Sequence, residues 1–318
     1  MLRDFNIMAF STAHIAHAVT LSEGGDGQPE APVLVFDSGV GGLSVAAEIR
    51  RHWPALSLAY VCDNAALPYG TKADDWLVTR ITEVCVAAVK ASGARALVVA
   101  CNTASTLALT SLRKVLKIPV IGTVPAIKPA AALARVRQSD IRRQQGAPPV
   151  FALLATSATV RRSYTEQLIH DFASDCRVIR VAADPLVAEA ERRLRGEVSR
   201  PQVVTDSLAD LAAVEDLEVV ILGCTHFPLL SADISAALTK GAQGVQGDQV
   251  RVALIDSGAA IARRVAEVLA LKVLAADTHE QTATGIALAT DTGQAGLSIA
   301  LACQGFAPAR ALILENAV

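Results

Sequence analysis

The feature that most constrains the fold is a series of short aliphatic runs that do not alternate with polar residues. Each run ends in small polar residues and is followed by a segment with helical periodicity. Strands buried on both faces have this continuous apolar pattern, whereas half-exposed strands alternate. The runs therefore predict repeated β-α units in an open α/β fold with mostly parallel sheets. The clearest runs are PVLVFDSG, SLAYVCDN, RALVVACNTAS, IPVIGTV, VFALLATSAT, CRVIRVAA, EVVILGCTH and VALIDSG.

Two pairs of these runs resemble each other. LVVACNT (97–103) is similar to VILGCTH (220–226), and VLVFDSG (33–39) is similar to VALIDSG (252–258). We interpret the chain as two pseudo-symmetric α/β domains that face each other. Ligands of open α/β folds bind beyond the carboxyl ends of the strands, so we expect the active site in the cleft between the domains.

The chain is expected to divide into an N-terminal extension and two α/β domains. We expect residues 31–123 and 257–318 to form the first α/β domain and residues 124–256 to form the second. Residues 1–30 lack the unbroken apolar centre of a signal peptide and end in a linker-like segment, so they are predicted to be a flexible N-terminal extension. No uninterrupted apolar stretch is long enough to span a membrane. A cytoplasmic protein with no membrane association is expected.

Composition narrows the possible partners. With 52% hydrophobic residues the chain can bury a core, so disorder is excluded. Aromatic residues make up only 4% of the chain, and the formal net charge is −2. Binders of single strands usually carry more aromatic rings, and binders of duplexes usually carry a basic surface. We therefore expect no nucleic-acid partner, although a small phosphorylated ligand stays compatible with these numbers.

Six cysteines are scattered without a CxxC pair, which argues against a zinc ribbon and a disulfide-rich domain. Cys101 and Cys224 stand at matching strand ends, so they are expected on opposite walls of the cleft. A metal site would need a close third ligand, and a redox pair would need a shorter spacing. Two acid/base groups fit better, because inversion of an acidic C–H centre needs one group on each face, and the reference thiol pKa of about 8.5 lies near working pH. His226 is the candidate that assists Cys224.

The segment FDSGVGG after the first strand is the next candidate. Asp37 could orient a substrate ammonium group or assist Cys101, and Ser38 follows it. Gly39, Gly41 and Gly42 would allow close backbone approach and expose N–H groups, as at an anion site. The segment fits a dinucleotide fingerprint poorly, because Ser44 replaces the last small residue.

Two further loops follow strands at the same sheet edge. Pro68, Tyr69 and Gly70 form a turn, which is either only a turn or part of the site. Thr156 and Thr159 could cap a helix and also clamp a carboxylate, because a helix N-terminus serves both purposes. The remaining cysteines, Cys62, Cys85, Cys176 and Cys303, are interpreted as small hydrophobic residues. The arginine pairs 142–143, 161–162, 192–193 and 263–264 are interpreted as solvated helix faces.

Taken together, the motifs resemble those of the glutamate racemase family. DSGVGGLSV, DNAALPYGTK, ACNTAS, ATSATVRRSY and ILGCTHFPLL occur in the family's order and at roughly its spacing, over residues 31–275. The resemblance implies a cofactor-independent isomerase that interconverts L- and D-glutamate and supplies D-glutamate for peptidoglycan synthesis, cell wall biogenesis and cell shape. It implies no pyridoxal phosphate and no metal.

The resemblance also implies roles for individual residues. Cys101 is similar to the thiol that acts on D-glutamate and Cys224 to the thiol that acts on L-glutamate, while Asp37 and His226 match the residues that assist them. The positions similar to those that hold the substrate are Ser38, Pro68, Tyr69, Gly70, Asn102, Thr103, Thr156, Thr159 and Thr225.

Alternatives within and outside this family stay open. Relatives that act on aspartate tend to have an acidic residue in place of His226, so CTH favours glutamate over an aspartate or hydantoin racemase. DNAALPYG and the N-terminal extension resemble the subgroup activated by UDP-N-acetylmuramoyl-L-alanine. An additional non-catalytic role, the inhibition of DNA gyrase, is known for some members. The segment TATGIALATDTGQAGLSIALACQGF departs from the family pattern, and either a monomer or a homodimer is expected.

Overall fold

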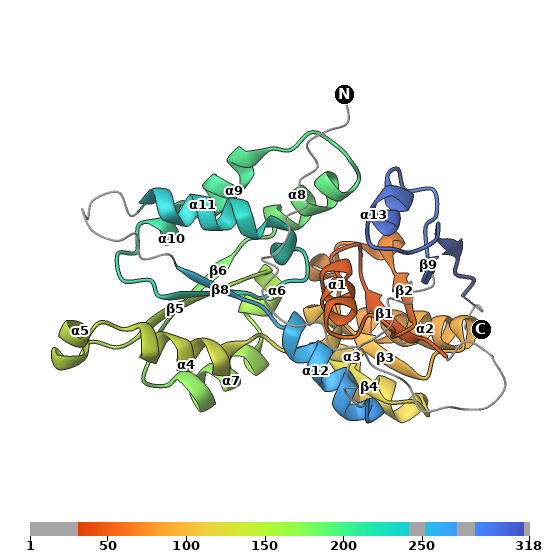
Figure 1. Ribbon diagram of the computed structural model, residues 1–318, viewed down its shortest axis with the longest axis horizontal. Coiled ribbons are helices and arrows are strands. Elements are labelled where there is room, and N and C mark those ends of the chain that lie inside the picture. Colours follow the sequence, from red (N-terminus) through yellow and green to blue (C-terminus); the bar gives the residue numbers. More distant parts are fainter. Residues whose placement is uncertain (1–30, 242–251, 272–283, 315–318) are drawn as a thin grey trace.

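The strands of the computed structural model form two separate parallel sheets (Figure 1). The structure describes residues 31–241, 252–271 and 284–314, so the predicted N-terminal extension lies outside the described residues. One sheet has the order β10-β9-β2-β1-β3-β4 and the other has the order β6-β5-β7-β8. The strands are β1 (Val33–Asp37), β2 (Leu58–Cys62), β3 (Ala96–Val99), β4 (Val120–Gly122), β5 (Val150–Ala155), β6 (Arg177–Ala182), β7 (Val219–Leu222), β8 (Ala253–Ile255), β9 (Ile286–Ala289) and β10 (Arg310–Ala311).

Helices cover both faces of each sheet, which explains the continuous apolar runs. In β1, Val33 and Val35 pack toward α1, α12 and α13, whereas Leu34 and Phe36 pack toward α2 and α3. The smaller sheet is enclosed in the same way by α8 to α11 on one face and by α4 and α7 on the other. The helices are α1 (Leu43–His52), α2 (Asp74–Ser92), α3 (Asn102–Val115), α4 (Ile127–Arg137), α5 (Asp140–Gln144), α6 (Ser157–Val160), α7 (Ser163–Ala173), α8 (Pro185–Leu194), α9 (Pro201–Ser207), α10 (Ala209–Ala212), α11 (Ser231–Gly241), α12 (Gly258–Leu269) and α13 (Leu297–Cys303), with single turns η1 (Asn64–Ala66), η2 (Tyr69–Thr71) and η3 (Phe227–Leu230).

All eight aliphatic runs contain a strand, so the predicted α/β fold with parallel sheets is confirmed. Strands β9 and β10 were not among the predicted ones. β9 pairs with β2 and extends the larger sheet on the side away from β3. Its apolar residues Ile286–Ala289 lie within TATGIALATDTGQAGLSIALACQGF, the segment that departs from the family pattern.

The strand orders correct one of the two internal matches. When the strand order β2-β1-β3-β4 of the larger sheet is compared with the order β6-β5-β7-β8 of the smaller one, β1 corresponds to β5 and β3 corresponds to β7. The match between the Cys101 and Cys224 segments is therefore confirmed, because these segments follow β3 and β7. The match between 33–39 and 252–258 is wrong, because β8 occupies the position of β4. Both DSG segments make the same local turn, in which the aspartate accepts the N–H two residues later.

The chain passes between the two sheets near residues 124 and 257. There the Ser257 hydroxyl donates to the carbonyl of Val124 over 2.7 Å. The division into domains after residues 123 and 256 stays a prediction. The strands of the smaller sheet lie within residues 124–256, and those of the larger sheet lie outside this range. Among the described residues, no helix has the length and apolar character that crossing a membrane requires.

The predictions for the remaining cysteines and the arginine pairs hold only in part. Cys62 and Cys85 are buried as expected, but Cys303 is exposed, so its interpretation as a packed hydrophobic residue is wrong. Arg162 and Arg193 are also not merely solvated. Arg162 forms an ion pair with Asp74 from the other sheet's helices, and Arg193 joins Glu189 to Asp233.

Candidate active site

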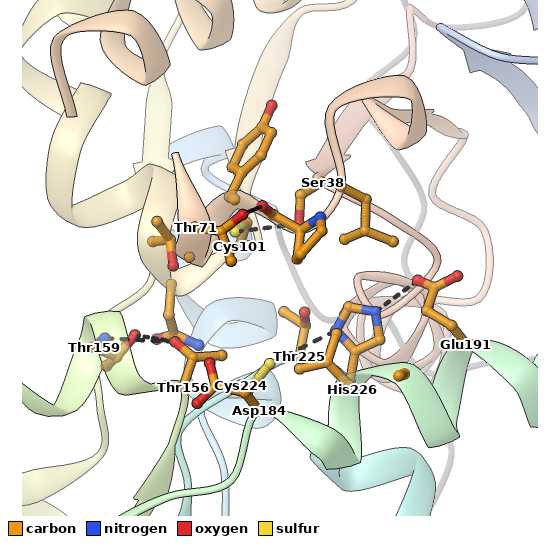
Figure 2. Close-up of a pocket in the computed structure, with 18 of the residues that line it drawn as sticks. Ser38, Thr71, Cys101, Thr156, Thr159, Asp184, Glu191, Cys224, Thr225 and His226 are labelled. Carbon is orange, nitrogen blue, oxygen red and sulfur yellow. Dashed lines mark hydrogen bonds and ion pairs between the residues drawn. The ribbon is translucent and has the colours of Figure 1, made fainter. Parts of the chain in front are cut away.

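A cavity of ≈ 470 Å³ lies between the carboxyl ends of the two sheets. This volume is within the range of small-molecule sites. The larger sheet contributes one wall and the smaller sheet the other (Figure 2). Every residue predicted for the site lines this cavity except Asp37. The predicted residues in the lining are Cys101, Cys224, His226, Ser38, Pro68, Tyr69, Gly70, Asn102, Thr103, Thr156, Thr159 and Thr225.

Cys101 lies on the wall formed by the larger sheet, directly before helix α3. Cys101 is 7% exposed, and its sulfur lies 3.7 Å from the Ser38 hydroxyl oxygen. Burial raises the pKa of the Cys101 thiol to about 12, and the charge of Asp37 adds to this, while hydrogen bonds from the Ala104 N–H and Ser38 oppose it. At neutral pH Cys101 is therefore a protonated thiol and can serve as an acid.

Cys224 lies on the opposite wall and belongs to a chain of three polar side chains. Its sulfur is 3.6 Å from Nδ1 of His226, and Nε2 of His226 is 2.7 Å from Oε1 of Glu191. Burial opposes a charge on the imidazole, but the hydrogen bonds to Cys224 and Glu191 raise the pKa of His226 well above its usual value. Burial acts against the Glu191 charge too, yet His226 and the Val40 N–H keep the pKa of this carboxyl below normal. The protonated imidazole therefore places a hydrogen-bond donor beside the sulfur of Cys224.

Glu191 was missed by sequence reasoning. It lies on α8, 35 residues before His226, and is only 3% exposed at its side chain. Nothing in the local pattern EAERRL separates Glu191 from an ordinary surface glutamate. Its partnership with His226 arises only when α8 packs beside η3.

The glycines after β1 make room for this chain of side chains. A Cβ atom on Gly41 would lie 2.5 Å from Nδ1 of His226, and one on Gly39 would overlap Oε1 of Glu191. A backbone N–H of this loop does bind an anion, as expected, because the Val40 N–H donates to the Glu191 carboxylate over 2.9 Å. The anion is therefore a carboxylate of the chain itself, held across the cleft.

Asp37 is fully buried behind the cavity. Its carboxylate accepts hydrogen bonds from the Thr225 hydroxyl at 3.1 Å and from the Gly39 N–H at 3.1 Å. Burial raises the pKa of Asp37 to about 6, although the nearby His226 lowers it. Its direct contacts join the two walls of the cleft, and it influences Cys101 through its charge.

The turn Pro68–Gly70 lines the cavity as predicted. The Tyr69 hydroxyl, however, forms its hydrogen bond elsewhere. This hydroxyl donates to Asp63 over 2.8 Å, so Tyr69 contributes its ring and backbone to the wall. Burial together with the charge of Asp63 raises the pKa of Tyr69 far above its usual value. The phenol therefore stays protonated.

Polar groups without charge complete both walls. Thr156 caps α6 and its hydroxyl lies 3.2 Å from that of Thr159 (Figure 2). On the opposite wall, Oδ1 of Asn102 is buried and has no hydrogen-bond partner within the described part of the chain. Buried polar atoms are nearly always paired, so this oxygen is suited to accept an N–H from a bound ligand.

The arrangement can move a proton between two faces of a small polar molecule. One wall presents a thiol, and the other presents a sulfur beside an imidazolium, so one acid and one base face the cavity. No group of three or more His, Cys, Asp or Glu side chains in residues 31–241, 252–271 and 284–314 could hold a metal ion.

Comparison with known proteins agrees with this geometry. The sequence model of the Asp/Glu/Hydantoin racemase family matches residues 42–265. A glutamate racemase of Sodalis glossinidius is 44% identical over 235 residues, which cover 74% of this chain and 73% of that protein. The crystal structure of Escherichia coli glutamate racemase with L-glutamate and the activator UDP-MurNAc-Ala is similar at a TM-score of 0.74 and 36% identity, covering 90% of this chain and 99% of that one. A Bacillus anthracis glutamate racemase isoform is similar at a TM-score of 0.67 and 30% identity, covering 92% and 100%.

Proposed function

The chain belongs to the Asp/Glu/Hydantoin racemase family, and from this membership and its cavity we propose that it racemises glutamate with two cysteines as the acid and base. The observation that carries the proposal is the placement of Cys101 and Cys224 on opposite walls of one cavity. The family role of the product is the supply of D-glutamate for peptidoglycan.

In the L-to-D direction, the Cys224 thiolate removes the α-proton and the Cys101 thiol delivers a proton to the opposite face. His226 donates to the sulfur of Cys224, while Cys101 begins as the thiol. Thiol and thiolate exchange roles at the end of the turnover, which leaves the pair ready for the reverse reaction. The α-proton of glutamate is weakly acidic, so donors to the carboxylate must stabilise the charge that develops there. Asn102, Thr103 and Thr225 line the cavity as candidates.

Exclusion of water is the second requirement. Contacts across the cleft hold the two walls together, including the bond from Thr225 to Asp37 and the ion pair from Arg162 to Asp74. In a dry site, fixed donors act more strongly on a developing charge than they do in water. We propose that glutamate binds with its α-carbon between the two sulfurs and its carboxylates toward the hydroxyl and amide groups.

The other functions considered are less well supported. The curated relatives at 40–45% identity are glutamate racemases, which favours glutamate over aspartate and hydantoins. None of the comparisons favours a gyrase-inhibiting role. We propose a cytoplasmic location, because a mechanism with two free thiols needs a reducing compartment.

Solvent exchange at the α-carbon tests the two-base mechanism. When only a small fraction of the L-glutamate is converted in deuterium oxide, the D-glutamate product should carry deuterium. The recovered L-glutamate should stay largely unlabelled, since a proton removed from one face is not returned to it. Proton NMR after separation of the enantiomers measures both. Rapid labelling of the recovered substrate would indicate a single base and reject the assignment.

We also propose that UDP-N-acetylmuramoyl-L-alanine activates this chain, as its sequence subgroup suggests. The Escherichia coli structure, similar over 90% of this chain, contains that molecule as an activator. Adding it to the purified full-length protein should raise kcat for L-glutamate by about tenfold or more, of the order of allosteric couplings between sites. UDP-N-acetylglucosamine serves as the matched control. Equal rates with and without the activator would contradict this proposal but not the racemase activity.

A further inference from the structure

The segment that precedes the turn Pro68–Gly70 is hydrogen-bonded to the C-terminal part of the chain. Residues 63–65 precede this turn, and they form side-chain hydrogen bonds with Thr290, Asp291 and Gln294. The partners are more than 220 residues apart in the sequence. Pairing of β9 with β2 brings them together, because residues 63–65 follow β2 and Thr290 follows β9 directly.

The Thr290 hydroxyl is the centre of this contact. It donates to Oδ1 of Asp63 over 2.8 Å and accepts the N–H of Ala65 over 3.1 Å. Both functions of the hydroxyl are used, so the side chain fixes the backbone and a carboxylate at once. A hydroxyl can do both, whereas the methyl groups of a valine can do neither.

Asn64 makes the second part of the contact. Its amide nitrogen donates to the carbonyl of Asp291 over 2.7 Å and to the side chain of Gln294 over 2.9 Å. Its amide oxygen accepts the Asp291 N–H over 3.0 Å. Asn64 is 8% exposed, so these bonds are shielded from water.

Asp63 connects this contact to the cavity. It is fully buried and accepts the Tyr69 hydroxyl over 2.8 Å, and Tyr69 lines the cavity next to Gly70. Arg80 binds the same carboxylate with two nitrogens, at 2.9 and 2.7 Å. The charge of Asp63 therefore stays compensated when the Thr290 hydroxyl is removed.

We propose that Thr290 and Asn64 are positioning residues, which hold the turn Pro68–Gly70 in its substrate-binding place from the C-terminal segment. This rests on the proposed racemisation of glutamate. The match to the family model ends at residue 265, so this contact lies partly outside the region that defines the family. The C-terminal strands then do more than extend the sheet, because they complete one wall of the cavity.

The turn Pro68–Gly70 carries neither of the two sulfurs proposed as acid and base. Cys101 and Cys224 lie on other segments, after β3 and β7. Displacing the turn weakens the binding of substrate and transition state alike, which raises KM and leaves kcat nearly unchanged.

Thr290→Val tests the proposal, since valine keeps the shape and loses the hydroxyl. We expect KM for L-glutamate to rise about tenfold and kcat to stay within about threefold, because a bond to a buried carboxylate is lost. Thr290→Ser retains the hydroxyl and should restore KM to within about twofold of wild type by the same reasoning. Thr239→Val is the matched control, because the Thr239 hydroxyl donates to the Ser235 carbonyl within its own helix.

Several results would overturn the proposal. They are an unchanged KM in Thr290→Val, a loss carried by kcat instead of KM, or an equal KM defect in Thr290→Ser. If thermal unfolding shows that Thr290→Val does not fold, Asn64→Ala is measured against the same expectation. A wild-type protein that does not racemise glutamate would reject the proposed function instead, so the two failures are distinguishable.

Discussion

Replacing either Cys101 or Cys224 by serine should reduce kcat/KM for glutamate by about a thousandfold or more, within the range of lost acid/base catalysis. Serine keeps the size of the side chain, but its hydroxyl does not ionise near neutral pH. Racemisation needs a group on each face, so each single variant should lose both directions. Circular dichroism of the reaction mixture, started from L- or D-glutamate, measures this loss.

The remaining cysteines provide the control for this experiment. Cys303 is exposed and Cys176 is partly exposed, and neither lines the cavity. Cys303→Ser and Cys176→Ser should therefore keep wild-type rates. Near wild-type turnover in Cys101→Ser or Cys224→Ser would rule out the two-thiol mechanism.

Replacing Glu191 by glutamine should lower kcat/KM by about a hundredfold, because the charge that supports the imidazolium is lost. Glutamine can still accept from the Val40 N–H and from Nε2 of His226. A neutral His226 that donates through Nε2 has no proton on Nδ1, so it cannot donate to the sulfur of Cys224. The two enantiomers have equal free energy in solution, so kcat/KM must fall equally in both directions.

The pH dependence of this variant separates charge from packing. Hydrogen bonds with Glu191 and Cys224 raise the pKa of His226 in the wild type against the effect of burial. Without the Glu191 charge, this pKa should fall back toward about 6.5 or below. The loss of activity in Glu191→Gln should therefore deepen as the pH rises from about 6 to about 8, the interval around that reference value. Steady-state rates across this interval measure it.

Glu189→Gln is the matched control on the same helix. Glu189 is 2% exposed and bonds to Arg193 and to the N–H of Arg200, away from His226. Its replacement should lower the melting temperature and leave kcat/KM near wild type. If both glutamine variants lose activity in proportion to their loss of stability, Glu191 acts only through folding.

Most of the cavity was predictable because its residues follow strands. Cys101, Asn102 and Thr103 lie within four residues of the end of β3, and Cys224 and Thr225 follow β7 closely. Parallel strands place their carboxyl ends at one edge, so a local pattern in the sequence predicts where these side chains meet. The roles assigned to them stay predictions until the variants are measured.

The contacts that orient these residues could not be predicted in this way. Glu191 reaches His226 from a different helix, and the Tyr69 hydroxyl bonds to Asp63 instead of facing the cavity. A side chain on a helix or turn has several possible partners, and the sequence does not rank them. Only packing of the elements selects one.

The sequence by itself determined the order of β-α units, the strand-end positions of the two cysteines and the family. These properties depend on local periodicity and on short motifs. The tertiary structure decided that Glu191 meets His226, that the glycine loop clears space for both, and that β9 joins the larger sheet beside β2. These depend on pairings between distant segments, whose free energy exists only once the sheets and their helices have packed together.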